Sequence, residues 1–153
     1  LRGFKTKKEH QIEGRTFHEP KFSTTTGKAQ AHVIALHAPA EISSNQLRLM
    51  TIRSEGQFNT VVYEEEDVFR KQTRRDVVLM NEQDISAFGV QVDSFVTVAG
   101  PSGTLVVQVK AYPIAKGNCA MYYPEANILL STKVDDESKT PFFKGEVVAI
   151  KKN

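Results

Sequence analysis

Four short apolar segments separated by turn-forming residues constrain the fold of this chain more than any other feature. They are 77–80 (Val-Val-Leu-Met), 95–99 (Phe-Val-Thr-Val-Ala), 105–109 (Leu-Val-Val-Gln-Val) and 147–150 (Val-Val-Ala-Ile). Apolar runs of this length, rich in valine and flanked by polar or turn residues, are typical of β-strands rather than of helices. The sequence therefore predicts a protein that is mainly β.

Two local patterns refine the prediction of β-structure. Gly100-Pro-Ser-Gly103 joins two of the segments, and its proline and final glycine suit a type I turn, so a hairpin is expected there. In the stretch 46–53 the alternation of apolar and polar residues breaks where Leu49 and Met50 stand side by side, and it resumes out of phase at Ile52. This break predicts either a β-bulge or a strand that is buried on both faces.

Helical signals are few. Asn81 is predicted to cap a short helix over 82–88, with Asp84 answering it as the capping partner and Gly89 ending it. The stretch 64–75 has acidic and basic residues at i,i+4 spacing, which predicts a solvated helix or loop rather than a binding patch.

The beginning of the chain is polar and has little periodicity. A turn is predicted at Ser23–Gly27 and a short strand at 31–36. We expect residues 1–43 to be a lead or linker segment, flexible before about Lys21, and residues 44–153 to form the folded domain.

Composition excludes several classes of protein. The chain has 153 residues and a net charge of +2, which suits one domain and lacks the strongly basic character expected of a nucleic-acid binder. No apolar run approaches the length of a membrane span, so we expect a protein without one. The single cysteine, Cys119, is interpreted as a buried and inert thiol that follows a strand. The histidines have no metal-ligand spacing, and neither a metal site nor a catalytic pair is predicted. The histidines are His10, His18, His32 and His37.

Three segments carry side chains that are suited to binding a large polar ligand. They are 51–60 (Thr-Ile-Arg-Ser-Glu-Gly-Gln-Phe-Asn-Thr), 122–127 (Tyr-Tyr-Pro-Glu-Ala-Asn) and 138–144 (Ser-Lys-Thr-Pro-Phe-Phe-Lys). Their guanidinium, amide and hydroxyl groups can donate to phosphate oxygens and to the edges of heterocycles. This is the chemistry of binding rather than of bond breaking.

In this order, the three segments resemble the C-terminal cofactor-binding domain of molybdopterin-dinucleotide oxidoreductases, the formate dehydrogenase and nitrate reductase group. The resemblance covers roughly 46–151 and is nearest to formate dehydrogenase-like alpha subunits. It implies a double-psi β-barrel, the fold shared with aspartate decarboxylase, with two or three short helices. It also implies that the domain holds molybdopterin guanine dinucleotide in a molybdenum or tungsten oxidoreductase.

The same resemblance implies which residues contact the cofactor. They are Thr51, Arg53, Gln57, Asn59, Thr60, Asn127, Phe143 and Lys144. We expect Arg53, Asn59 and Lys144 to converge at one rim of the barrel. The catalytic groups would belong to the rest of the parent chain, so we expect the isolated fragment to be inactive and to hold no cofactor. The expected partners are that parent chain and the pterin dinucleotide, and the expected location is the cytoplasm.

Two other functions were considered. A stand-alone double-psi barrel that binds a protein or peptide partner is the alternative that remains open. A decarboxylase of the same fold would need a Gly-Ser bond to form its pyruvoyl group, and this sequence has no Gly-Ser dipeptide. A reading frame that continues upstream into a long segment with cysteine clusters would favour the oxidoreductase.

Overall fold

The computed structural model describes residues 21–35, 41–54, 56–59 and 62–153. The chain divides into two units, Leu1–Pro39 and Ala40–Asn153. In the described part of the first unit, the amide of Gly27 donates to the carbonyl of Thr24 at 3.0 Å, so the predicted turn is confirmed. The predicted strand at 31–36 is wrong, because residues 31–35 form no strand. The lead before Lys21, which we expected to be flexible, lies outside the described residues.

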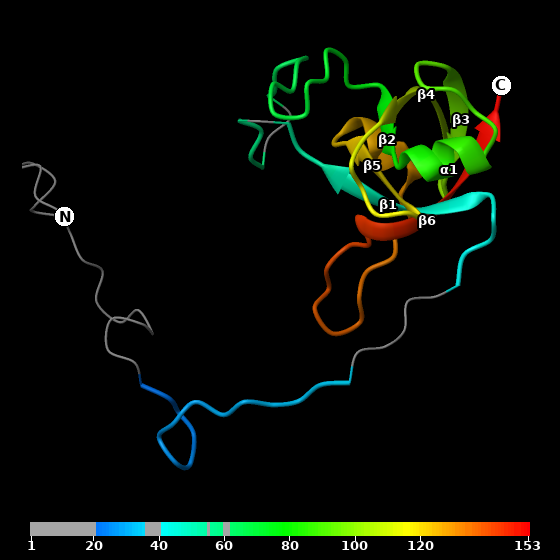
Figure 1. Cartoon of the computed structure of the whole chain (residues 1–153). Coiled ribbons are helices and arrows are strands. Elements are labelled where there is room, and N and C mark those ends of the chain that lie inside the picture. The colour runs from blue at the N-terminus through cyan, green and yellow to red at the C-terminus, as the bar shows by residue number, and fades with distance from the viewer. Residues whose placement is uncertain (1–20, 36–40, 55, 60–61) are drawn as a thin grey trace, which may run out of the picture. The chain divides into compact units, whose positions relative to one another are not determined.

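The second unit is a closed barrel of six strands in the order β1-β5-β2-β4-β3-β6 (Figure 1). The strands are β1 (Gln46–Ile52), β2 (Val77–Met80), β3 (Phe95–Ala99), β4 (Thr104–Ala111), β5 (Asn118–Tyr122) and β6 (Lys144–Lys152). β1 pairs in parallel with β5 and β2 with β4, whereas the other four pairings are antiparallel. This is the double-psi β-barrel, so the fold expected from the resemblance is confirmed.

Two apolar clusters hold the barrel together. The larger one fills the interior with side chains from all six strands, including Leu47, Val78 and Val96. The smaller one lies on the other face of β2 and β5 and consists of Val77, Leu79, Ala120 and Tyr122. β2 is therefore buried on both faces, which explains why its four residues are all apolar.

β5 was not predicted as a strand. Cys119, interpreted from the sequence as following a strand, lies within β5 and is fully buried. The predicted inert thiol is consistent with its surroundings, because burial, together with the nearby Asp84 carboxylate, raises the pKa of Cys119 to about 12.

We expect the Cys119 thiol to resist alkylation in the native chain. Because the thiolate is the reactive form, labelling at pH 8 should be more than about a thousandfold slower in the folded chain than in the unfolded chain. Mass spectrometry after iodoacetamide treatment, with and without denaturant, measures this ratio. Equal labelling of the two samples would contradict the burial of this strand.

A β-bulge occurs where the sequence pattern breaks, but the extra residue is in the partner strand. Leu49 pairs with Glu146 and Met50 with Lys144, so Gly145 is the unpaired residue and has a φ of 96°. A residue with positive φ at a bulge favours glycine, because glycine has no Cβ. The bulge changes the face on which Lys144 emerges from β6.

The hairpin between β3 and β4 is confirmed, and its glycines are required by packing. The turn lies against η2, a 3-10 helix over Glu125–Leu129. A Cβ on Gly100 would be 2.1 Å from the carbonyl oxygen of Leu129, and one on Gly103 would be 2.9 Å from that of Ile128. The turn and η2 can approach this closely only without side chains at these two positions.

The short helix predicted after Asn81 forms. α1 (Glu82–Ala87) begins at Asn81, whose side chain accepts from the amide of Gln83 at 2.9 Å. Asp84 does not complete a capping box, because its carboxylate accepts from the amide of Gly117 at 2.7 Å. In the described part of the chain, no helix is long and apolar enough to span a membrane.

The stretch 64–75, predicted to be a solvated helix or loop, is not helical. The backbone of Asp67 exchanges hydrogen bonds with that of Gln72, at 2.8 and 3.0 Å, in an isolated antiparallel bridge. Lys71, in the turn between them, has a φ of 54°, which is incompatible with a helix. Asp67 also bonds to the hydroxyl of Tyr122 in β5 at 2.8 Å, so tertiary contacts override the local i,i+4 pattern.

Candidate functional site

A cavity of about 780 Å³ opens at one end of the barrel. It is bounded by the end of β1 and the loop that follows, by η2 and the end of β5, and by the chain entering β6. Its lining residues are Thr51, Ile52, Arg53, Asn59, Arg70, Tyr123, Asn127, Leu130, Pro141, Phe143 and Lys144. β1 and β5 are parallel neighbours, so their carboxyl ends deliver two of these segments side by side.

The cavity brings together six of the eight residues that the sequence resemblance implied. They are Thr51, Arg53, Asn59, Asn127, Phe143 and Lys144. Arg53, Asn59 and Lys144, which are far apart in the sequence, lie around this one cavity. Thr60 lies outside the described residues. Gln57 is buried and does not line the cavity.

Gln57 instead supports the loop from inside. Its side-chain amide donates to the carbonyl of Tyr123 at 3.0 Å, and its carbonyl oxygen accepts from the amide of Ser54 at 3.3 Å. Gln57 thus ties the loop after β1 to the end of β5. In this structure its side chain faces the protein rather than the cavity.

The lining is cationic. It includes Arg53, Arg70 and Lys144, and the described residues of the lining include no aspartate or glutamate. The Lys144 ammonium donates to the carbonyl of Thr51. Burial, and then the charge of Arg53, lowers the pKa of Lys144. An anion placed between these cations would stabilise their charged forms, so the cavity is suited to a ligand with phosphate groups.

Aromatic and amide groups complete the lining. The Arg53 guanidinium lies 5.9 Å from the centroid of the Tyr123 ring, within the range of a cation–π interaction. The Thr51 hydroxyl donates to the carbonyl of Phe143 at 2.9 Å, which fixes the chain next to β6. Asn59 and Asn127 are exposed and carry both donors and acceptors.

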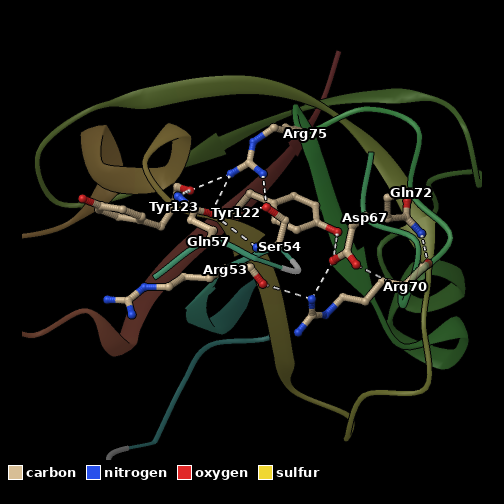
Figure 2. Close-up of polar contacts among 9 residues, drawn as sticks. All are labelled: Arg53, Ser54, Gln57, Asp67, Arg70, Gln72, Arg75, Tyr122 and Tyr123. Carbon is tan, nitrogen blue, oxygen red and sulfur yellow. Dashed lines mark hydrogen bonds and ion pairs between the residues drawn. The ribbon is translucent and has the colours of Figure 1, made fainter. Parts of the chain in front are cut away.

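Arg75, two residues before β2, connects the segments that line the cavity (Figure 2). Its Nε donates to the Glu125 carboxylate at 2.6 Å, its Nη1 to the hydroxyl of Ser54 at 2.8 Å, and its Nη2 to the carbonyl of Tyr123 at 2.6 Å. One buried guanidinium therefore joins the loop after β1, the end of β5 and the start of η2.

Two tyrosine rings cover the same guanidinium. Its carbon lies 3.6 Å from the centroid of the Tyr63 ring and 4.8 Å from that of Tyr122. The structure shows that Glu125 begins η2 and is the ion-pair partner of Arg75.

Those lining residues that the structure describes carry no thiol, imidazole or carboxyl group, and they offer hydrogen bonds and charge instead. Among the residues that the structure describes, no three His, Cys, Asp or Glu side chains are grouped so that they could hold a metal ion.

Comparison with known proteins decides the family. Residues 47–146 match the family described as "Molydopterin dinucleotide binding domain". The chain belongs to this family. The matched region contains β1 to β5, η2 and the start of β6, so it includes every segment that lines the cavity. The match confirms that this is a molybdopterin dinucleotide-binding domain, as the sequence resemblance implied, and it supports a molybdopterin-type cofactor.

Relatives and solved structures place the domain among longer proteins. An uncharacterized oxidoreductase of Mycobacterium tuberculosis is 34% identical over 143 residues, covering 85% of this chain and 18% of that protein. Protein YdeP of Escherichia coli is 28% identical over 124 residues, covering 74% of this chain and 16% of its own. Acetylene hydratase from Pelobacter acetylenicus superposes with a TM-score of 0.55 at 17% identity, covering 70% of this chain and 18% of that one. The chain thus spans less than a fifth of the length of these proteins.

Arg70 and Arg75 are not among the site residues that the sequence predicts. Both lie in the segment 64–75, whose charge pattern predicts a solvated helix or loop. The sequence shows the spacing Asp67-x-x-Arg70, but no neighbouring residue indicates that Asp67 is buried and bonded to the hydroxyl of Tyr122. That contact joins residues 55 positions apart.

Proposed function

We propose that the cavity of this molybdopterin-binding domain holds part of a molybdopterin guanine dinucleotide. The observation that carries the proposal is the convergence of Arg53, Arg70 and Lys144, from three separate segments, on one cavity. A dinucleotide has a diphosphate and two heterocyclic ends, so it needs cationic, amide and aromatic groups together. The donor set of this cavity fits these requirements.

The lining suggests a role for each kind of side chain. Arg53 and Lys144 would bind phosphate oxygens. The exposed amides of Asn59 and Asn127 would donate to and accept from the edge of the guanine or the pterin. Tyr123 and Phe143 would lie against the faces of the rings, where stacking adds affinity. Thr51 would contribute mainly by fixing Phe143 through its hydroxyl.

At the level of the whole protein, we propose a molybdopterin-dependent oxidoreductase, with molybdenum or tungsten held by the pterin. The relative described as an oxidoreductase supports this class, and the domain spans 18% of that protein. We propose further that the enzyme is formate dehydrogenase-like and cytoplasmic, with this domain at its C-terminal end. The remainder of the parent chain would supply the metal ligand and the catalytic groups, so the isolated fragment would be inactive.

The exposed apolar side chains of the loop after β1 favour a protein partner as well. Phe58, Val68 and Phe69 are 76%, 72% and 73% exposed, in a segment that also borders the cavity. We propose that the rest of the parent chain covers this segment. The stand-alone barrel with a peptide partner remains the alternative function.

Removing a cation from the cavity should weaken retention of the cofactor. A charged hydrogen bond contributes about 1.5–3 kcal/mol, so Arg53→Gln or Lys144→Gln should make cofactor loss from the complete protein roughly tenfold faster. The measurement is pterin per mole of protein, determined by fluorescence after oxidation, during prolonged dialysis.

Lys110→Gln is the matched control. Lys110 is also a lysine near a charged partner, but it pairs with Asp93 and does not line the cavity. Its variant should lose cofactor at the wild-type rate. If Arg53→Gln and Lys144→Gln both behave like Lys110→Gln, this cavity is not the cofactor site, and the partner-binding function becomes the better one.

A further inference from the structure

The segment 67–72 contains Arg70, which lines the cavity and is held there by the buried carboxylate of Asp67. It is a tight turn closed by the backbone pair of Asp67 and Gln72. Asp67 is only 1% exposed, and its carboxylate accepts from the hydroxyl of Tyr122 at 2.8 Å and from Nη1 of Arg70 at 2.6 Å. Figure 2 shows Asp67 between Tyr122 and Arg70.

Arg70 is held by one edge of its guanidinium. Nη1 donates to Asp67 and also to the carbonyl of Arg53 at 3.1 Å. Among the described residues, the side-chain hydrogen bonds of Arg70 are all made by Nη1, so Nε and Nη2 are left for another acceptor. The side chain is 27% exposed and lines the cavity. It therefore presents donors to whatever the cavity holds.

The arrangement is costly in stability. Burying a carboxylate removes it from water, and an ion pair in such a place is often no more stabilising than apolar residues of the same volume. Burial raises the pKa of Asp67, but hydrogen bonds from Arg70 and Tyr122 outweigh it and bring the pKa below its ordinary value. Asp67 is therefore ionised at neutral pH, and it fixes the orientation of the Arg70 guanidinium.

A fixed arginine is a better ligand-binding group than a mobile one. An unrestrained arginine loses side-chain entropy when it binds, whereas one that is already held by a carboxylate loses less. The guanidinium keeps its charge and can donate two parallel hydrogen bonds to a phosphate. The bond to the Arg53 carbonyl also couples Arg70 to the loop that carries Arg53 and Asn59.

We propose that Arg70 is a further ligand-binding residue of the cavity, donating through Nε and Nη2 to phosphate oxygens of the bound dinucleotide. Asp67 and Tyr122 are positioning residues that fix its guanidinium. This inference rests on the proposed function. It adds a third phosphate-binding cation to Arg53, which follows β1, and Lys144, which begins β6, and this third cation lies in the turn 67–72.

Two measurements on the complete, cofactor-containing protein test the proposal. The first is the rate of cofactor loss from Arg70→Gln, which should be roughly tenfold faster than from the wild type. The matched control is Arg74→Gln, because Arg74 also pairs with a carboxylate, Asp76, but does not line the cavity. That variant should lose cofactor at the wild-type rate.

The second measurement needs no variant, so it remains decisive if Arg70→Gln fails to fold. Phenylglyoxal modifies accessible arginines, and peptide mass spectrometry reports each site. Bound cofactor should protect Arg70 by severalfold relative to the cofactor-free protein, whereas Arg74, whose side chain is 40% exposed, should react equally in both forms. Equal modification of Arg70 in both forms would overturn the proposal.

The positioning role of Asp67 is tested by a double-mutant cycle. Asp67→Asn should speed cofactor loss in the wild-type background and should have no further effect on that rate in the Arg70→Gln background. A purely structural role would instead give the same increment in both backgrounds, and that result would remove Asp67 from the proposal.

The outcomes separate this inference from the proposed function. If Arg53→Gln and Lys144→Gln speed cofactor loss but Arg70→Gln matches Arg74→Gln, the cavity is the cofactor site and Arg70 is not one of its ligands. If none of the three cavity variants changes the rate, both the inference and the proposed function fail.

Discussion

Replacing Arg75 with methionine should lower the free energy of unfolding by about 3 kcal/mol, near the lower end of the range for breaking a buried ion pair. The variant leaves the Glu125 carboxylate without its ion-pair partner and the Ser54 hydroxyl without the donor that Arg75 supplies, and it leaves the Tyr123 carbonyl with Gln57 in place of two donors. The Glu125 side chain is 24% exposed, so water replaces part of the lost interaction. Denaturant unfolding of the purified chain measures the loss.

The neighbouring residue provides the control for Arg75. Arg74 forms an ion pair with Asp76, but both side chains are 40% or more exposed. Exposed pairs contribute little, so Arg74→Met should cost less than about 1 kcal/mol. If the two variants were equally stable, the guanidinium of Arg75 would not be what joins the loop after β1 to β5 and η2.

Replacing Gly100 with alanine should be nearly as damaging, because the new methyl group meets backbone rather than a flexible side chain. Its Cβ would lie 2.1 Å from the carbonyl oxygen of Leu129 and 2.8 Å from that residue's Cα. The turn or η2 must move, which exposes part of the buried Leu129. Overpacking of this kind typically costs 1–3 kcal/mol, and we expect about 3 kcal/mol here.

A graded series within the same turn tests this explanation. Gly103→Ala meets the Ile128 carbonyl at 2.9 Å, a smaller overlap, and should cost less than Gly100→Ala. Ser102→Ala changes an exposed side chain and should change stability by less than about 0.5 kcal/mol. If Gly100→Ala is as stable as Ser102→Ala in denaturant unfolding, η2 does not lie against this turn.

Much of the barrel could be predicted because each strand carries its own signal. The apolar runs at β2 and β3 were located with their observed limits, and the turn at Gly100–Gly103 was identified from two residue types. A bulge does occur opposite the predicted break, but its unpaired residue is Gly145 in β6 rather than a residue of β1. The apolar pattern of β1 breaks because buried Thr51 bonds to the Phe143 carbonyl from an inward position.

The failures have a common physical cause. β5 and the segment 63–75 take their structure from contacts with distant residues rather than from local periodicity. The hydroxyl of Tyr122 in β5 donates a hydrogen bond to the Asp67 carboxylate of the other segment. Arg75 donates to the carboxylate of Glu125, which is fifty positions away. A window of ten residues contains neither partner, so the charges around Arg70 were taken to face water.

Part of the candidate site could be predicted, although its residues come from distant segments. Arg53, Asn127 and Lys144 were found because they belong to motifs that the family resemblance brought together. The same resemblance implied Gln57, whose side-chain amide binds the Tyr123 carbonyl and does not line the cavity, and its contact with the cofactor stays a prediction. The sequence identifies the loop, but the backbone conformation of the loop determines which of its side chains point into the protein and which point into the cavity.

The position of β6 has a consequence for the order of events during synthesis. This last strand pairs with both β1 and β3 and so closes the barrel, and it also contributes Lys144 to the cavity. Until it emerges from the ribosome, β1 and β3 have unpaired edges and the cavity lacks one wall. We therefore expect the cavity to take up its ligand only after β6 has been translated.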